Sequence, residues 1–354
     1  MQPTVHFDEG VIVKTHPNQH YKTLFNRKTG FFARLEDEGY DEPFWCEKGP
    51  ELIDLSITNY CERQCSFCYR YTTREPGHIS MSLFEKLLKQ ASDTGVMQIA
   101  LGGGNPNQNP HFKEIIREIR STGIVPSYTS NGDGLTDDIL KATAEHCGAM
   151  AVSVYEFKED VLAETIDRIT SFGIRLNLHL LLVRNHLKYI RKWLQDPPGF
   201  MEKVNAVIFL NYKPINSGED IRIDTEDEWK NFFRMIEESN RVNIGFDSCC
   251  VPGLLKYTKA VSKTLIEPCE AARFSAFISE EGKMYPCSFM VNTERYGNLK
   301  ENSLQDIWRY NRFFVDFRNA ISYNQCRGCK LQGVCQGGCQ FKPEINNCDN
   351  GIRG

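Results

Sequence analysis

Two periodicities of hydrophobic and polar residues alternate between residues 50 and 245. Short apolar runs typical of β-strands are each followed by a segment in which apolar residues recur every three to four positions, as on one face of a helix. The predicted strands are Leu52–Thr58, Met97–Leu101, Ile124–Thr129, Ala149–Tyr155, Arg175–Val183 and Val204–Asn211. The predicted helices are 82–94, 111–122, 136–146, 159–172, 186–195 and 226–240. Six β/α units in a row predict a parallel sheet with helices packed outside it.

The β/α series is two units short of a closed eight-stranded barrel. It therefore predicts either a partial (β/α)6 barrel or an open, doubly wound sheet. In both architectures ligands bind where the carboxyl ends of the strands meet. Three cysteines follow the first predicted strand and three glycines follow the second, so we expect both features on the ligand-binding face.

Local signals mark several helix ends. Ser82 and Thr225 each stand three residues before a glutamate, which is the spacing of a capping box. Glycines stand at four predicted helix C-termini, where a left-handed cap requires no Cβ, namely Gly95, Gly123, Gly148 and Gly173.

The β/α period is absent from both ends of the chain. Residues 21–25 and 31–35 flank a Gly-containing turn and predict a β-hairpin, and residues 274–279 and 283–289 predict a second one. One helix, at 303–320, precedes a tail rich in Gly and Cys. We therefore divide the chain into an N-terminal β-hairpin region (1–48), the β/α domain (49–245) and a Cys-rich C-terminal extension (246–354).

The composition is that of a globular protein. The 42 Lys and Arg against 46 Asp and Glu leave a formal charge of −4, and no run approaches the roughly 18 apolar residues of a membrane span. A slightly acidic chain without long Lys/Arg runs argues against a nucleic-acid partner. The N-terminal residues contain no basic segment followed by an apolar run, which argues against a secretory signal. We expect a cytoplasmic protein that binds neither nucleic acid nor membranes.

The fourteen cysteines are the unusual feature of the composition. Without an export signal, clustered thiols indicate metal binding rather than disulfides. The first group is Cys61, Cys65 and Cys68, in a CxxxCxxC pattern. Three thiolates from one loop can hold three irons of a [4Fe–4S] cluster and leave the fourth iron without a protein ligand. An open metal position is typical of chemistry rather than of structure.

This pattern, with Phe67 as the aromatic of CxxxCxΦC, resembles the radical S-adenosylmethionine (AdoMet) enzymes. The resemblance implies that AdoMet chelates the open iron and that its cleavage yields a 5′-deoxyadenosyl radical, which abstracts a hydrogen atom from the substrate. It also implies an external electron donor such as flavodoxin or ferredoxin. Gly103, Gly104 and Asn105 align with the family's GGEP, in which backbone carbonyls receive the methionine amino group and Asn here replaces the usual Glu. Further AdoMet contacts are implied at the family's TNG position and at the end of strand four, namely at Ser130, Asn131 and Ser153.

The second group of cysteines resembles the SPASM extension of radical AdoMet enzymes, which binds auxiliary [4Fe–4S] clusters. The tail has the pattern Cys326-x2-Cys329-x5-Cys335-x3-Cys339, then Cys348, and Cys269 and Gly282-x4-Cys287 precede it. The resemblance assigns one cluster to Cys326, Cys329, Cys335 and Cys348. It assigns the other to Cys269, Cys287 and Cys339, which leaves one ligand missing. Cys249 or Cys250 is the nearest available thiol, either as that ligand or as a hydrogen-atom donor to a substrate radical.

The reaction stays open between three classes. SPASM relatives mostly mature peptides and proteins, which implies a crosslink, an epimerisation or a dehydrogenation in a peptide substrate. The alternatives are a small-molecule oxidoreductase with the same clusters and a zinc-structured, non-catalytic binding module, because CxxC pairs also bind zinc. Ser288 stands where sulfatase-maturing relatives carry an Asp base, so Asp247 is the candidate base, with a turn or cap residue as its alternative. The first fifty residues are too short and strand-poor for a leader-binding winged helix, so leader recognition would require a separate protein.

Overall fold

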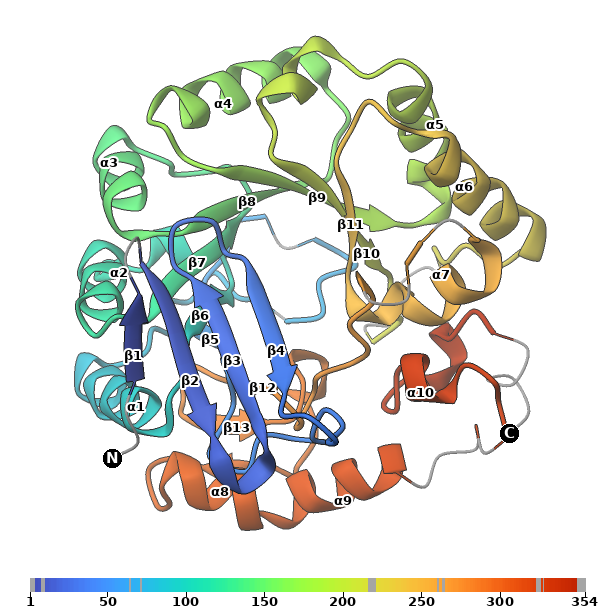
Figure 1. The fold of residues 1–354 in the computed structure, drawn as a ribbon. Coiled ribbons are helices and arrows are strands. Elements are labelled where there is room, and N and C mark those ends of the chain that lie inside the picture. The colour runs from blue at the N-terminus through green and yellow to red at the C-terminus, as the bar shows by residue number, and fades with distance from the viewer. Residues whose placement is uncertain are drawn as a thin grey trace.

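The computed structural model describes residues 4–7, 10–63, 65–70, 72–215, 221–259, 261–262, 265–322, 326 and 328–348. Its centre is a curved sheet with the strand order β11-β10-β9-β8-β7-β6-β5-β12-β13-β14 (Figure 1). Neighbouring strands from β11 to β12 are parallel, and β13 and β14 are antiparallel additions. The strands are β5 (Leu52–Thr58), β6 (Gln98–Gly103), β7 (Val125–Ser130), β8 (Ala149–Val154), β9 (Leu176–Leu182), β10 (Ala206–Asn211), β11 (Ile244–Phe246), β12 (Ser275–Ile278), β13 (Lys283–Tyr285) and β14 (Gly297–Asn298).

Six helices follow the outer arc of this sheet (Figure 1). They alternate with the parallel strands and are α1 (Met81–Thr94), α2 (Phe112–Ser121), α3 (Asp137–His146), α4 (Glu159–Ser171), α5 (Leu187–Gln195) and α6 (Glu226–Glu238). Because these helices cover one face only, the sheet is a partial barrel, and the alternative of an open, doubly wound sheet is wrong. The predicted partial (β/α)6 barrel is confirmed.

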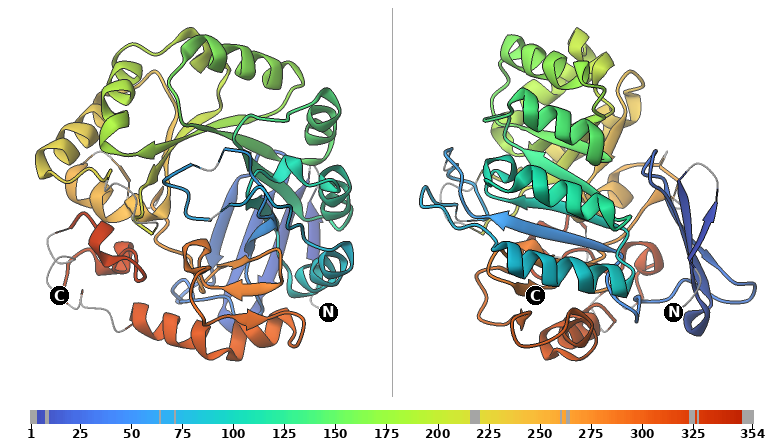
Figure 2. Two further views of the ribbon diagram at one scale, coloured as in Figure 1. Left: turned by 180° about the vertical axis from the view of Figure 1, so that it is seen from behind. Right: turned by 90° about the vertical axis from the view of Figure 1, so that its left-hand side faces the viewer.

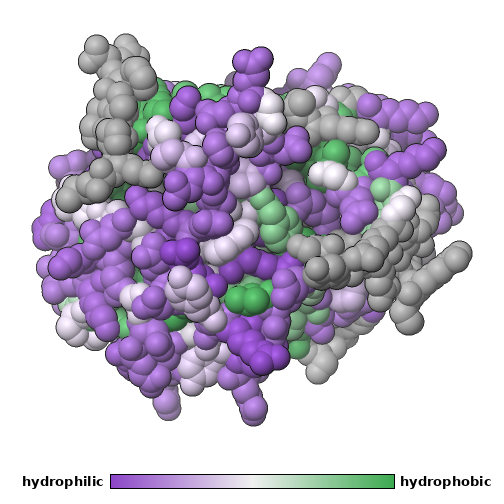
Figure 3. Space-filling view, turned by 60° about the horizontal axis from the view of Figure 1, so that its bottom comes forward, coloured by the Kyte–Doolittle hydropathy of each residue, from purple (hydrophilic) through white to green (hydrophobic). Residues whose placement is uncertain are grey.

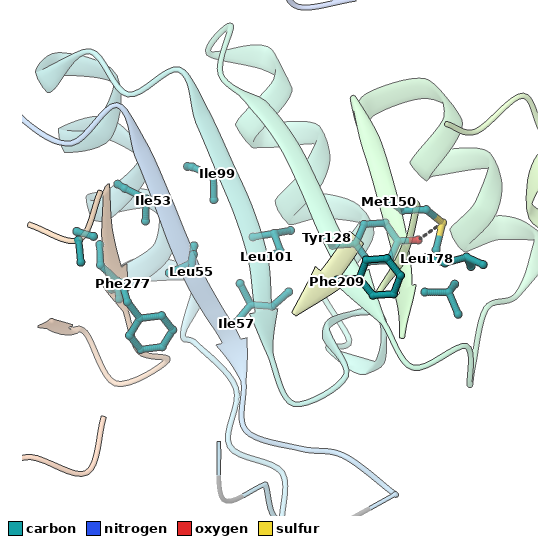
Figure 4. Close-up of a cluster of buried hydrophobic side chains, with 14 of the residues drawn as sticks. Ile53, Leu55, Ile57, Ile99, Leu101, Tyr128, Met150, Leu178, Phe209 and Phe277 are labelled. Atoms are coloured by element: carbon teal, nitrogen blue, oxygen red, sulfur yellow. Dashed lines mark hydrogen bonds between the residues drawn. The ribbon is translucent and has the colours of Figure 1, made fainter. Parts of the chain in front are cut away.

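The core lies between the sheet and these helices (Figure 4). Ile53, Leu55 and Ile57 of β5 are fully buried there. The alternate residues Asp54 and Ser56 point to the opposite, concave face, since successive side chains of a strand alternate. The concave face is thus polar at its first strand.

Some predicted helix ends differ from the structure. The N-cap of α1 is Ser80, whose hydroxyl accepts from the Leu83 N–H, so the capping box placed at Ser82 is wrong. The helix start at Thr225 is confirmed as an N-cap, because its hydroxyl accepts from the Glu228 N–H at 3.2 Å. Three of the four predicted glycine caps have positive φ, whereas α3 ends in an extended Cys147 before Gly148.

The N-terminal region is larger than a hairpin. The predicted hairpin is present as β3 (Tyr21–Asn26) and β4 (Phe32–Glu36), and β1 (Thr4–Phe7) and β2 (Val11–His16) extend it to a four-stranded antiparallel sheet. The expectation of a strand-poor region is therefore wrong. In the side view of Figure 2 this sheet stands beside the barrel.

The N-terminal sheet packs on the amino ends of barrel strands. Phe25 forms a buried cluster with Met97 and Val125, which lie where β6 and β7 begin. Arg34 of β4 pairs with the buried Glu51 at 2.8 Å, just before β5. The sheet thus covers the end opposite to the expected site and leaves the carboxyl ends of the strands free.

The C-terminal extension wraps around the open side of the barrel. The predicted helix at 303–320 is two helices, α8 (Leu304–Tyr310) and α9 (Arg312–Ser322), separated by Asn311. Two shorter helices, α7 (Val251–Tyr257) and α10 (Gln332–Cys335), contact each other near the cysteine-rich tail. Among the described residues no helix has the length and apolar character needed to cross a bilayer. The face drawn in Figure 3 is mainly hydrophilic, with small scattered apolar areas.

Candidate functional site

The first cysteine group lies in the loop that leaves the carboxyl end of β5. Backbone hydrogen bonds tie this loop, from the Cys61 N–H to the Thr73 carbonyl and from the Cys68 N–H to the Cys65 carbonyl, both at 3.0 Å. Burial, with the neighbouring sulfurs of Cys68 and Cys61, raises the pKa of Cys65. The three thiols thus lie close to one another, as the ligands of one metal cluster do.

Side-chain donors point at two of these sulfurs. The Asn131 amide donates to the Cys61 sulfur at 3.6 Å, and the Thr72 hydroxyl donates to the Cys68 sulfur at 3.9 Å. The sulfur ligands of iron–sulfur clusters accept hydrogen bonds of this kind. The donor set therefore fits a [4Fe–4S] cluster with three protein ligands.

The glycine loop after β6 packs directly against the chain that enters the cysteine loop. The Gly104 N–H donates to the Thr58 carbonyl at 2.7 Å, and a Cβ on Gly104 would lie 1.9 Å from the Tyr60 oxygen. Gly103 has a φ of +109°, and its Cβ would lie 2.1 Å from the Thr58 oxygen. The sequence suggested that these glycines admit a ligand, but the chain's own backbone already requires them.

Asn105, predicted as a cofactor-binding residue, braces the loops after β6 and β7. It is 1% exposed, and its Oδ1 accepts from the Ser130 hydroxyl at 3.1 Å and from the Asn131 N–H at 3.2 Å. Its Nδ2 donates to the Asp133 carbonyl at 3.0 Å. Asp133 is in turn held by the Arg63 guanidinium, in the cysteine loop, at 2.5 and 2.7 Å. The predicted residues Asn105, Ser130 and Asn131 thus form one network that reaches the first cysteine.

A hollow opens beside the aromatic residue of the cysteine pattern. Phe67 packs on Tyr155 with ring centroids 5.5 Å apart, and the Tyr155 phenol hydrogen-bonds the Ser153 side chain. The hollow has a volume of about 540 Å³ and is lined by residues of 155–158 and 184–189, after β8 and β9. Its size and aromatic wall fit a nucleoside next to the cysteine loop.

Four cysteines of the tail form a second group, namely Cys326, Cys329, Cys335 and Cys348. Burial raises the pKa of Cys326, and the nearby sulfurs of Cys348 and Cys329 add to this shift. Burial raises the pKa of Cys335 to about 11, although the N–H groups of Gly337 and Gly338 point at its sulfur. The Leu331 N–H donates to the Cys329 sulfur at 3.5 Å. Four thiols, two of them with backbone donors to their sulfurs, fit an iron–sulfur cluster with a complete ligand set.

A third group consists of Cys249, Cys269, Cys287 and Cys339. The Cys249 thiol hydrogen-bonds the Cys339 sulfur, which raises the pKa of Cys249 and lowers that of Cys339. Burial and the Cys249 sulfur raise the pKa of Cys269 to about 12, and burial with the sulfurs of Cys269 and Cys249 does the same for Cys287. Backbone N–H groups again point at the sulfurs, for example that of Lys342 at 3.3 Å from Cys339. This donor set also fits a cluster with four ligands.

Cys250 is not part of this group. Its side chain is buried and its sulfur lies 3.9 Å from the Phe209 carbonyl oxygen of β10. The structure therefore brings Cys249, and not Cys250, to the three cysteines that lacked a fourth partner.

Two charged residues at the site had no sequence signal beyond their place near loops of the barrel mouth. Lys213, two residues after β10, has a side chain only 2% exposed and pairs with the predicted Asp247 at 3.3 Å. Arg70, two residues after Cys68, is 5% exposed and pairs with Glu280 at 3.1 Å. Asp247 also accepts from the Asn211 N–H at 3.2 Å and does not cap the following helical turn with its side chain.

The cysteine loop and the C-terminal extension are in direct contact. Tyr69 stacks on Phe289 with ring centroids 4.2 Å apart, and these residues lie one and two positions from Cys68 and Cys287. The Arg70–Glu280 pair adds a second link, between the loop and the β12–β13 turn. The first and third cysteine groups are therefore held in a fixed relation.

A further set of metal-ligating atoms lies at the opposite end of the barrel. His16, Cys46 and Glu51 offer donor atoms within 4.8 Å of one another. Glu51 is already bound by Arg34 and by the Tyr21 hydroxyl, and the charges of Lys48, Lys14 and Arg34 act on His16. This set is a packed polar contact beneath the N-terminal sheet and is separate from the site.

Comparison with known proteins matches two family models to the chain. The radical SAM superfamily matches residues 55–192, and the SPASM iron–sulfur cluster-binding domain matches residues 269–330. The chain is 25% identical to a tungsten-containing aldehyde ferredoxin oxidoreductase cofactor-modifying protein of Pyrococcus furiosus, over 80% of this chain and 88% of that protein. It is 22% identical to a PqqA peptide cyclase of Xanthomonas axonopodis, over 82% and 83%. The solved structure of Streptococcus suis SuiB bound to S-adenosylmethionine has a TM-score of 0.76 at 14% identity, over 97% of both chains, and SuiB bound to its precursor peptide SuiA has a TM-score of 0.74.

Proposed function

Because this chain is a radical SAM enzyme with a SPASM domain, we propose that it modifies a peptide or protein substrate by a crosslink, an epimerisation or a dehydrogenation. The enzyme binds AdoMet and [4Fe–4S] clusters, which together supply a radical that abstracts a hydrogen atom from the substrate. The task of the protein is to hold these groups, to orient the substrate and to exclude water from the reaction.

The observation that carries the proposal is the arrangement of eleven cysteines in three groups, one at the barrel mouth and two in the extension against it. The relatives include a PqqA peptide cyclase at 22% identity, and SuiB, which shares the fold, has been solved with a precursor peptide. Together these two proteins support a peptide substrate.

We assign the metal ligands by these groups. Cys61, Cys65 and Cys68 would hold the AdoMet-binding cluster. One auxiliary cluster would lie at Cys326, Cys329, Cys335 and Cys348, and the other at Cys249, Cys269, Cys287 and Cys339. The hydrogen bond between Cys249 and Cys339 supports a ligand role for Cys249 over that of a hydrogen-atom donor.

AdoMet would be held between the glycine loop and the hollow beside Phe67. The backbone of Gly104 is positioned by its hydrogen bond to Thr58 of β5. The ring of Phe67 packs on Tyr155, which hydrogen-bonds Ser153, so these residues lie between the cysteine loop and the hollow. Asp247 is our candidate base: its carboxylate is 21% exposed and lies 3.3 Å from the Lys213 ammonium.

A small-molecule substrate is the second candidate. The Pyrococcus relative, at 25% identity, is described as modifying a cofactor rather than a peptide. In either case we expect an external electron donor such as flavodoxin or ferredoxin. A peptide substrate with a leader would add a separate leader-binding protein. The fourteen cysteines, none of which is in a disulfide, fit a reducing compartment such as the cytoplasm.

The test is anaerobic incubation of the reconstituted enzyme with AdoMet, dithionite and peptides encoded next to its gene, followed by mass spectrometry. A product lighter by two mass units indicates a crosslink or dehydrogenation, and deuterium uptake from heavy water without other mass change indicates epimerisation. Turnover of a small molecule, with every such peptide recovered unchanged, would favour the second candidate. Formation of 5′-deoxyadenosine in a variant with all three of Cys61, Cys65 and Cys68 changed to Ala would overturn the cluster assignment itself.

A further inference from the structure

Lys213 is a cation that the fold keeps away from water. Its side chain is 2% exposed, and its ammonium lies 3.9 Å from the centre of the Phe289 ring. Its hydrogen bonds go to the Asp247 carboxylate and to the Asn211 carbonyl, both at 3.3 Å. Burying an ammonium is costly, so an interior lysine requires negative charge nearby.

One carboxylate is not the only negative charge that Lys213 faces. The sulfurs of Cys249, Cys287 and Cys339 also act on its ammonium and favour its charged form. Phe289 connects the two sites, because its ring lies against Lys213 while its N–H points at the Cys287 sulfur. Three of the four thiols in the third cysteine group thus lie within electrostatic reach of one buried cation.

We propose that Lys213 raises the reduction potential of the auxiliary cluster at Cys249, Cys269, Cys287 and Cys339. The inference rests on the ligand assignment made for the proposed function. A cluster gains one negative charge when it is reduced, so a fixed positive charge nearby stabilises the reduced state more than the oxidised state. The effect is large because Lys213 and the cluster would be shielded from solvent and would interact through a low dielectric. A cluster with a raised potential takes up an electron more readily.

Asp247 has the opposite effect in the same place. Its carboxylate partly cancels the Lys213 charge, and removing the lysine would leave this anion alone beside the cluster. Lys213→Gln should therefore lower the potential, whereas Asp247→Asn should raise it. Lys213→Arg keeps the charge and should stay close to the wild type. A merely steric role for Lys213 does not predict shifts of opposite sign.

The experiment is a redox titration of the reconstituted, full-length protein, followed by electron paramagnetic resonance. Addition of AdoMet identifies the first cluster, because only its signal changes. In Lys213→Gln, one of the two remaining transitions should move to a lower potential. The ratio of reduced to oxidised cluster at a fixed potential should fall about tenfold, which corresponds to about 59 mV for a one-electron couple. Lys14→Gln is the matched control. Lys14 is a part-buried lysine that donates to the Gly95 carbonyl, at the end of the barrel that the N-terminal sheet covers. Its replacement should shift neither transition.

Unchanged transitions in Lys213→Gln at full iron content would overturn the inference. So would shifts of the same sign in Lys213→Gln and Asp247→Asn, because a charge effect must change sign. If Lys213→Gln lost iron, Lys213→Arg and Asp247→Asn would decide, and iron loss in all three variants would make Lys213 structural and overturn the proposal. A wild-type protein with only one cluster would instead contradict the ligand assignment, which separates the two failures.

Discussion

Two asparagines join the loops after β6 and β7 through shared partners. The Ser130 hydroxyl lies 3.1 Å from the Asn105 Oδ1 and 2.8 Å from the Asn107 Oδ1. Both side-chain amides donate to the Asp133 carbonyl, at 3.0 and 2.7 Å. Because each partner is bound twice, we predict that the two asparagines substitute for one another and that removing both costs more than the sum of the single losses.

The magnitude follows from the groups left without partners. Asn107→Ala leaves Ser130 and Asp133 bound by Asn105, so it should cost about 1 kcal/mol. Asn105→Ala also leaves the buried Asn131 N–H without an acceptor and should cost about 2–3 kcal/mol. The double variant removes the last partner of both shared groups, so we expect an additional coupling of about 2 kcal/mol.

Hydrogen exchange read by mass spectrometry measures this coupling directly. The relevant amides are those of 131–133, and all three depend on the network. The Asn131 N–H donates to the Asn105 Oδ1, the Gly132 N–H to the Ser130 hydroxyl and the Asp133 N–H to the Asn131 side chain. A coupling of about 2 kcal/mol makes local opening about 30-fold more frequent in the double variant than the product of the single effects. The loop also carries the amide that donates to the Cys61 sulfur, so AdoMet binding should weaken in parallel.

The control uses a third asparagine in the same loop. The Asn109 amide donates to the Ile57 carbonyl at 2.7 Å and shares no partner with Asn105. Asn109→Ala combined with Asn105→Ala should therefore be additive. The shared-partner reasoning would be refuted if the increase in hydrogen exchange in the Asn105/Asn107 double variant equalled the product of the increases in the two single variants.

Three further predictions concern other parts of the site and the fold. Gly104→Ala should destabilise the protein by about 2 kcal/mol or more and weaken AdoMet binding in equilibrium dialysis, because the added Cβ would lie 1.9 Å from a backbone oxygen. In the control Gly102→Ala the added Cβ meets nothing within 4 Å, so this variant should be tolerated. Cys249→Ala should lower the iron content by about four atoms per chain, and Cys250→Ala should leave it unchanged by elemental analysis. Burial and three neighbouring cations lower the pKa of His16 to about 4. The contribution of the neutral His16 to the free energy of unfolding, up to about 3 kcal/mol, is therefore present above pH 6.5 and is lost as the pH falls toward 4. In His16→Gln the melting temperature should depend less on pH across this range, and an unchanged slope would refute this prediction.

The barrel was predictable because its signals are local. Each of the six strands and six helices carries its own periodicity, and helix starts such as that at Thr225 carry their own capping residues. The error at Ser82 has the same origin: Ser80 and Ser82 are two hydroxyls in the same turn, and only the packing of α1 selects the first. Only the β3–β4 hairpin of the N-terminal sheet was predicted. β1 and β2 were missed because β1 has only four residues and β2, VIVKTH, begins with three apolar residues in a row rather than an alternation.

Long-range contacts had no such signal. β12 was expected in a separate hairpin, yet it pairs in parallel with β5, more than two hundred residues earlier, so the extension continues the barrel sheet. The contacts of Tyr69 with Phe289 and of Arg70 with Glu280 follow from this pairing. The role of Lys213 could not be predicted for the same reason, because its partners are Asp247, which follows β11, and three distant cysteines.

The choice between Cys249 and Cys250 as the fourth member of the third cysteine group depends on geometry that the sequence pattern does not contain. Cys249 and Cys250 are adjacent and equally distant from the other cysteines along the chain, so spacing alone does not separate them. Both lie in one short 3-10 turn at 248–250, in which consecutive side chains point about 120° apart. Because Cys250 faces the β10 carbonyl of Phe209, Cys249 must face away from the barrel strand and toward the extension, where Cys339 receives its hydrogen bond. The turn thus places one thiol in the core and the other beside Cys339, and exchanging the two positions would require rotating the whole turn.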